Sequence, residues 1–160
     1  MKHLLIISLC SLFLLSGCHQ TDMRIPNVED SKRLVFNVIN RDNFEALDAD
    51  EIDFILSINE SEYESATVWQ DKTGKTIDEV GIFVAKNDAE SDALYSKVEE
   101  YVLACKAHKK EWLESYNPSE AIKLDQGALF RQGRCIGYAF LNKDEQSALF
   151  SSLMNFCSDP

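Results

Sequence analysis

Apolar and polar residues follow two different periods along this chain, which predict helices in some segments and strands in others. Apolar residues at helical spacing between positions 28 and 39 predict a first helix. Asp48 and Glu51 form the capping pair of a second, short helix over 48–56, because each side chain can bond the backbone N–H of the other at the helix start. Two helices are therefore predicted to precede the first strand.

Two β-hairpins are predicted farther along the chain. Residues 66–70 and 77–85 have strand character and are separated by a turn rich in Asp, Thr, Lys and Gly. Residues 128–131 and 135–141 form the second pair of strands, which turns at a Gln-Gly dipeptide. Each hairpin joins two strands that are adjacent in sequence, so we expect both pairs to be antiparallel.

Each hairpin is followed by a helix with the same kind of start. Asn87 with Glu90, and Asn142 with Glu145, make the two capping pairs. The helices also align residue by residue after their caps, which indicates either an internal duplication or two amphipathic helices that look alike because they share a cap. The predicted buried stripe of the first of them comprises Leu94, Val98, Tyr101, Val102, Cys105, His108 and Trp112.

These elements give the order ααββαββα and an α+β fold class, with 121–124 as a short strand or lead-in before the second hairpin. Two hairpins and their helices most simply build one mostly antiparallel sheet that is covered by helices on one face. The folded part is predicted to be a single domain over residues 28–160, which is enough chain for one hydrophobic core.

The first residues carry a different pattern. A lysine-containing start precedes an apolar run from Leu4 to Leu15, which is typical of a secretory signal peptide and too short to span a membrane. The run ends in Leu15-Ser16-Gly17-Cys18, which is similar to the bacterial lipobox, where the cysteine receives a diacylglyceryl group before cleavage. We predict a signal peptide over 1–17 and a lipidated cysteine with a short tether over 18–27; an ordinary signal peptide with a chance cysteine is the alternative.

Lipid on Cys18 implies a definite location. Two acyl chains give lasting attachment where one chain gives only marginal binding, so we expect a protein anchored in the cell membrane on its extracytoplasmic face. The chain has 16 Lys and Arg against 27 Asp and Glu, a net charge of −11. This charge disfavours nucleic acid as a partner and disfavours binding to anionic lipid, so the anchor would hold the protein at the membrane.

Three cysteines, Cys105, Cys135 and Cys157, belong to the predicted domain. An exported domain could pair two of them, but a sequence does not reveal which two. Each cysteine lies within an apolar pattern, which favours three buried, reduced thiols. The chain has no Cys-x-x-Cys motif and no Cys/His cluster, so we predict neither a metal site nor a cofactor.

Candidate catalytic groups are few. Cys105 and His108 share one face of the long predicted helix and could form a thiol–imidazole pair, although a histidine in an apolar stripe is more often packed in the core. Asp78 and Glu79 are an acidic pair in an otherwise apolar strand, but neighbours on a strand point to opposite faces and make a poor acid–base dyad. No catalytic residue is therefore assigned.

A surface interpretation depends on the strand at 77–85. Its alternation places Glu79 and Phe83 on the face opposite Val80, and Trp69 on the preceding strand is expected to join them. If helices cover only one face, Trp69, Glu79 and Phe83 form an aromatic patch with one acid that could bind a peptide, a sugar or a protein. If the N-terminal helices cover the second face, the same residues belong to the core.

The chain also resembles a known family in several soft motifs: the lipobox at Cys18, the strand segment Asp78-Glu79-Val80-Gly81-Ile82-Phe83, the long helix, and Tyr116 followed by Pro118. The family comprises small lipoproteins of Gram-positive bacteria whose mature part is catalogued as domain of unknown function four-three-five-eight. The resemblance covers nearly all of the mature chain and implies location and fold, because the family has no assigned activity. Cysteines are not part of the family's pattern, which implies no conserved disulfide.

Three hypotheses of function remain at this point. The first is a non-enzymatic lipoprotein that binds an envelope protein or peptide at the cell surface. The second is a regulatory or inhibitory module of the envelope, suggested only by loose analogy of architecture. The third is an envelope enzyme that acts through Glu79 or through the Cys105 and His108 pair.

Overall fold

The computed structural model describes residues 23–39 and 42–159 and confirms an α+β fold. Five α-helices accompany a five-stranded sheet, and a short 3₁₀ turn spans Glu60–Glu62. The elements, in chain order, are α1 (Val28–Val38), β1 (Phe44–Ala46), α2 (Ala49–Leu56), β2 (Ser65–Asp71), β3 (Glu79–Val84), α3 (Asp88–Tyr116), α4 (Pro118–Gln126), β4 (Ala128–Gln132), β5 (Cys135–Phe140) and α5 (Lys143–Ser158).

The sheet is antiparallel throughout, with the strand order β1-β2-β3-β5-β4. Its two central strands, β3 and β5, are buried at every position. They pair in a register that sets Gly81 opposite Tyr138 and Glu79 opposite Phe140. The two predicted hairpins are therefore joined into one sheet through their second strands.

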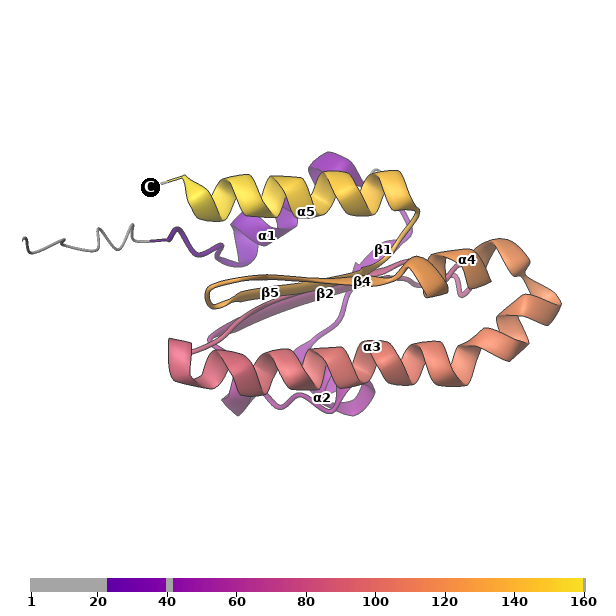
Figure 1. Cartoon of the computed structure of the whole chain (residues 1–160), viewed down its shortest axis with the longest axis horizontal. Helices are drawn as coiled ribbons and strands as arrows, with labels where there is room; N and C mark the ends of the chain where they lie inside the picture. Colours follow the sequence, from indigo (N-terminus) through magenta and orange to yellow (C-terminus); the bar gives the residue numbers. More distant parts are fainter. Residues whose placement is uncertain (1–22, 40–41, 160) are drawn as a thin grey trace, which may run out of the picture.

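Helices cover both faces of this sheet, which is the second of the two arrangements that the sequence left open. Figure 1 shows α1 and α5 on one side of the strands and α2 and α3 on the other. Two separate hydrophobic clusters result, one on each face. Strands β3 and β5 are buried at every position, and alternate positions face opposite sides of the sheet. Each side of the sheet therefore requires a covering layer of helices.

The two hairpin–helix units do not form a structural repeat. If the two units were a repeat, a two-fold axis normal to the sheet would exchange the antiparallel strands β3 and β5. Such an axis would place the helices that follow these two strands on the same face of the sheet. Instead α3 and α5 lie on opposite faces (Figure 1). Both helices begin with the same cap: Asn87 accepts from the Glu90 N–H and Asn142 from the Glu145 N–H, each at 3.0 Å.

Residues 121–124, expected as a strand or lead-in, belong instead to the helix α4. Pro118 occupies its first turn, where a missing N–H has no effect on the helix. Ala121 and Leu124 lie three residues apart on one helical face and are both buried, which explains why the segment is helical. The connection between α3 and the second hairpin is thus a helical hairpin.

The predicted buried stripe of α3 is correct only for its first part. Leu94 to Cys105 pack over the sheet, but His108 and Trp112 are exposed, and Trp112 retains 60 % of its surface. Helix α3 extends past the end of the strands and packs against α4 there (Figure 1), so a different face of the helix, marked by Leu113, becomes buried.

The predicted tether over 18–27 is partly docked on the domain. The guanidinium of Arg24 stacks over the ring of Phe156 at 4.1 Å, and the side chain of Met23 occupies the space beside Gly133 in the β4–β5 turn. Cys18 and the predicted signal peptide lie outside the described residues. Within the described part, no helix has both the length and the apolar character required to cross a membrane.

Candidate functional site

A groove of about 360 Å³ lies between α2 and α3. The capping box of Asp48 and Glu51 fixes the start of α2, and Ser57 in the left-handed conformation ends it. Burial of Ile52 and Leu56 holds this helix on the sheet and leaves Ile55 at the groove. The groove is lined by Ile55, Leu56, Ser57, Lys97, Glu100, Tyr101 and Ala104.

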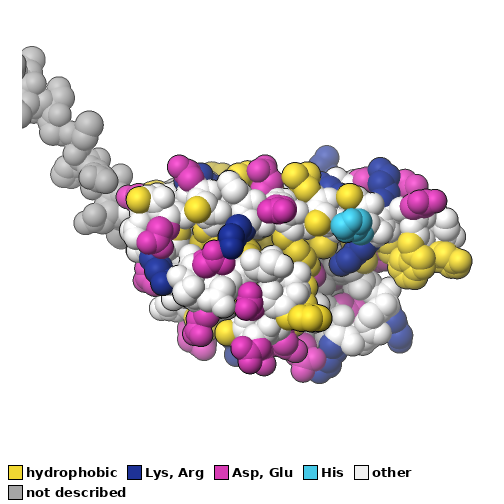
Figure 2. Space-filling view, turned by 90° about the horizontal axis from the view of Figure 1, so that it is seen from below, with side chains coloured by type: hydrophobic (Ala, Val, Ile, Leu, Met, Phe, Trp, Pro, Cys, Tyr) yellow, Lys and Arg dark blue, Asp and Glu magenta, His cyan; other side chains and the backbone are white. Residues whose placement is uncertain are grey.

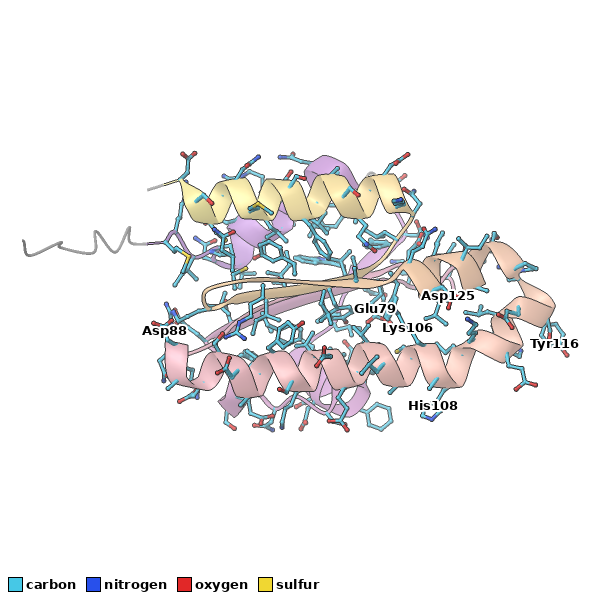
Figure 3. The ribbon with its side chains drawn as sticks, viewed as in Figure 1. Glu79, Asp88, Lys106, His108, Tyr116 and Asp125 are labelled. Atoms are coloured by element: carbon cyan, nitrogen blue, oxygen red, sulfur yellow. The ribbon has the colours of Figure 1, made fainter. Side chains whose placement is uncertain are left out.

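Tyr101 connects the groove to a polar cluster in the core. Its ring lines the groove, while its hydroxyl donates to Oε1 of Glu79 at 2.8 Å. The hydroxyl of Tyr138 donates to the same oxygen at 2.5 Å. Glu79 is 6 % exposed and points from β3 into the layer between the sheet and α3 (Figure 3). A buried acid with two phenolic donors therefore lies directly behind the groove.

Burial raises the pKa of Glu79, while the hydrogen bonds from Tyr138 and Tyr101 act in the opposite direction. Burial and the neighbouring Glu79 carboxyl likewise raise the pKa values of Tyr101 and Tyr138. Both phenols therefore remain protonated donors, and the environment favours the neutral form of the acid. The cluster is a hydrogen-bonded unit that orients Tyr101 toward the groove.

Gly81 makes the room that this cluster needs. A Cβ at Gly81 would stand 2.1 Å from Cε1 of Tyr138, which is fully buried. The ring lies flat over the backbone of the adjacent strand and contacts the rings of Phe83, Tyr101 and Phe140. The sequence contains a signal for this arrangement, a glycine between Glu79 and Phe83 on one face of a strand, which we had not interpreted as a space for an aromatic ring.

The predicted surface of Trp69, Glu79 and Phe83 does not exist, because all three residues are buried. Trp69 also lies on the wrong face: it pairs with Val80 and packs edge-on against Phe36 of α1, with ring centroids 5.9 Å apart. Phe83 lies on the other face and is fully covered. Helix α2 lies with α3 on the face of Phe83, and α1 lies with α5 on the face of Trp69 (Figure 1).

The two candidate catalytic pairs are not assembled. Cys105 is buried beside Tyr101, and burial raises the pKa of its thiol, whereas His108 points away from the sheet on the outer side of α3 (Figure 3). Asp78 accepts from Nζ of Lys123 at 2.8 Å, so it belongs to the contact with α4 and not to the Glu79 cluster.

Acidic side chains line a second hollow, of about 390 Å³, on the other side of α2. Asp50, Asp53 and Glu60 contribute the carboxylates. The described residues contain no group of three or more His, Cys, Asp or Glu side chains placed to hold a metal ion. Figure 2 shows many acidic side chains on this face of the molecule, which α2 and α3 cover.

Exposed aromatic residues gather where α3 and α4 project beyond the sheet. Trp112 and Tyr116 have ring centroids 5.6 Å apart and are 60 % and 75 % exposed. Ile122 of α4 is exposed at the same helical hairpin. Figure 2 shows hydrophobic side chains collected at this end of the molecule. It is a second apolar surface, separate from the groove.

Comparison with known proteins returned no match among family models, curated proteins or solved structures. The resemblance to small Gram-positive lipoproteins therefore stays a prediction from the sequence motifs. The geometry of the groove is the basis on which a function can be argued.

Proposed function

We propose that the protein is a lipoprotein anchored on the extracytoplasmic face of the cell membrane, and that its domain binds a peptide segment of an envelope protein in the α2–α3 groove. The observation that carries the binding proposal is the groove itself, whose lining includes the apolar residues Ile55, Leu56 and Ala104 together with Tyr101. Grooves between helices that combine apolar walls with a few polar groups commonly receive an apolar side chain of a partner.

The charge around the groove indicates which residues of the partner would flank its apolar side chain. Lys97 lines the groove and is bound to Oε1 of Glu62 at 2.5 Å, and Glu100 lines the same groove. The acidic hollow lies on the other side of α2, and the whole chain has a net charge of −11. Electrostatic complementarity therefore favours a segment with an apolar anchor next to Lys or Arg.

The docked N-terminal segment limits how an anchored domain could be oriented relative to the membrane. Because Met23 packs at the β4–β5 turn, only residues 19–22 separate it from Cys18, and the five Cα–Cα steps between the two residues can span at most roughly 18 Å. The β4–β5 turn, against which Met23 packs, and the end of α5 lie at one end of the molecule, and the α3–α4 hairpin lies at the other (Figure 1). We infer that the first end faces the membrane and that the groove opens sideways.

The anchor is tested by Cys18→Ser, with Cys10→Ser as the matched control. We expect Cys18→Ser to abolish lipidation, so that the protein is either released from the membrane or retained with its signal peptide uncleaved. Cys10 lies inside the predicted signal peptide, and its replacement should change neither outcome. Cell fractionation and the intact mass of the mature protein measure both. A Cys18→Ser protein that is fully processed and still membrane-bound would contradict the proposal.

The groove is tested by Ile55→Glu against Phe54→Glu. Both residues lie on α2 and both are exposed, at 38 % and 88 %, but only Ile55 lines the groove. A photoreactive amino acid at Ser57, also in the groove, reports the bound partner by crosslinking on intact cells. A carboxylate facing a bound apolar side chain should reduce the crosslinked product about tenfold or more, a loss of about 1.4 kcal/mol or more.

Phe54→Glu adds the same charge one residue away and should leave the crosslinked product near the wild-type amount. Equal losses in both variants would show that charge on α2 alone matters. A product that survives Ile55→Glu would contradict binding in the groove.

A regulatory or inhibitory module is the second candidate, favoured by the exposed pair of Trp112 and Tyr116 at the α3–α4 end. Aromatic residues are enriched at the centres of protein interfaces. Crosslinking from the α3–α4 end to an envelope enzyme, with no product from Ser57, would favour this candidate.

A further inference from the structure

Two of the three cysteines in the described part of the chain lie together. Cys135 is the first residue of β5, and Cys157 lies in the last turn of α5. Each is 1 % exposed, and both belong to the hydrophobic cluster on the α5 face of the sheet. Cys105 belongs to the cluster on the opposite face, beside Tyr101. The sheet therefore separates the single cysteine from the pair.

The two thiols lie close enough for each to be the main influence on the pKa of the other. An independent contact holds the same two elements together: Gln132 is the β4 partner of Cys135, and its Nε2 donates to Oγ of Ser158 at 2.9 Å. The end of α5 is thus fixed against the start of β5 at the side chains that flank the two sulfur atoms.

We propose that Cys135 and Cys157 are a dithiol that is oxidised to an intramolecular disulfide in the cell envelope. The location rests on the proposed export, since disulfides persist outside the cytoplasm and are rare within it. The bond would join the last turn of α5 to the sheet and close a loop over residues 136–156. Cys105 would remain a free thiol, which accounts for the odd number of cysteines in the domain.

The oxidant is a protein disulfide or a small-molecule disulfide. The Cys157 thiolate attacks one of its sulfur atoms, which releases one thiol and leaves a mixed disulfide on Cys157. The Cys135 thiol then loses its proton and attacks the Cys157 sulfur, which releases the second thiol and leaves the internal disulfide. The hydrogen bond from Cys135 lowers the pKa of Cys157 and so favours Cys157 as the first nucleophile. Its place in the final helical turn also favours access, because helix ends fray.

Tryptic peptides provide a direct test, because cleavage after Arg134 and Lys143 places the two cysteines in the separate peptides 135–143 and 144–160. The full chain is purified in detergent from the cell envelope, alkylated without reductant and digested. We expect mass spectrometry to find these two peptides linked, and to find Cys105 alkylated in the peptide 98–106. A second sample, reduced and then treated with oxidised glutathione, should regain the same link.

The two samples separate failure of the pairing from failure of the proposed export. Alkylation of both Cys135 and Cys157 after glutathione treatment, or a link that includes Cys105, would overturn the pairing. A link that forms with glutathione but is absent from the envelope sample would support the pairing and contradict export to an oxidising compartment.

A stability measurement gives a second readout. Reduction should lower the melting temperature of the oxidised protein by roughly 10 °C, since a disulfide across a loop of this length contributes substantially to a domain of this size. Cys135→Ser should remove the response to reductant, and Cys105→Ser should retain it. A response that survives Cys135→Ser would overturn the proposal.

Discussion

Gly81→Ala should lower the free energy of unfolding by about 3 kcal/mol, at the upper end of the usual cost of an overpacked core. The added Cβ would stand 2.1 Å from Cε1 of Tyr138. That ring cannot move aside easily, because Phe83, Tyr101 and Phe140 surround it and Glu79 holds its hydroxyl. Urea unfolding should show a lower midpoint with an unchanged slope.

Gly137→Ala is the matched control, on the neighbouring central strand. A Cβ at Gly137 would meet its nearest neighbours, the Gly81 carbonyl oxygen and Cδ1 of Leu153, at 3.4 and 3.7 Å, which are ordinary contact distances. Its replacement also reduces the freedom of the unfolded chain, so we expect a change of stability within about 1 kcal/mol of zero. Similar losses for both variants would contradict the assigned role of Gly81.

Glu79→Ala should cost about 4 kcal/mol of stability, since it creates a cavity and leaves the hydroxyls of Tyr101 and Tyr138 without their buried acceptor. Glu79→Gln should behave differently. The amide oxygen can replace Oε1 as the acceptor, and the side chain no longer ionises. At neutral pH we therefore expect Glu79→Gln to be as stable as the wild type or more stable.

The pH dependence distinguishes these effects. Burial raises the pKa of Glu79 above its usual value of 4.5, so the unfolded chain loses this proton at lower pH than the folded protein does. The contribution of Glu79 to stability is fully present below pH 4.5 and decreases as the pH rises through the folded-state pKa. The Glu79→Gln variant lacks this decrease. Its free energy of unfolding, measured by urea at several pH values, should gain on the wild type above pH 4.5; parallel curves would contradict the assignment.

Sequence signals that involve residues a few positions apart are sufficient to predict where most of the helices begin. Asp48 and Glu51 form the full capping box, and the side chains of Asn87 and Asn142 accept from the Glu90 and Glu145 N–H, because each cap depends on residues three positions apart. The short edge strand β1 was not predicted. Three residues are too few to show alternation, and β1 exists because it pairs with β2, where the Asn43 side chain donates to Asp71 at 2.6 Å.

The candidate site could not be derived from the sequence for a related reason. The alternation of the strand places Glu79 on the face opposite Val80 but does not show whether that face is covered. Its actual partners, Tyr101 and Tyr138, come from a helix and a strand farther along the chain, and only the strand register and the path of α3 bring them together. Trp69 was assigned to the wrong face because the register between β2 and β3 was unknown.

The contact between the two ends of the domain affects the order in which the chain can fold. Val35 of α1 and Ile39 just after it lie in the cluster that α5 completes with Leu149 and Leu153, and Arg24 stacks on Phe156 of the same last helix. During synthesis, the N-terminal segment can pack on β2 early but lacks α5, its other partner, until that helix has been made. The face of the sheet that α1 and α5 cover is therefore the last to be completed.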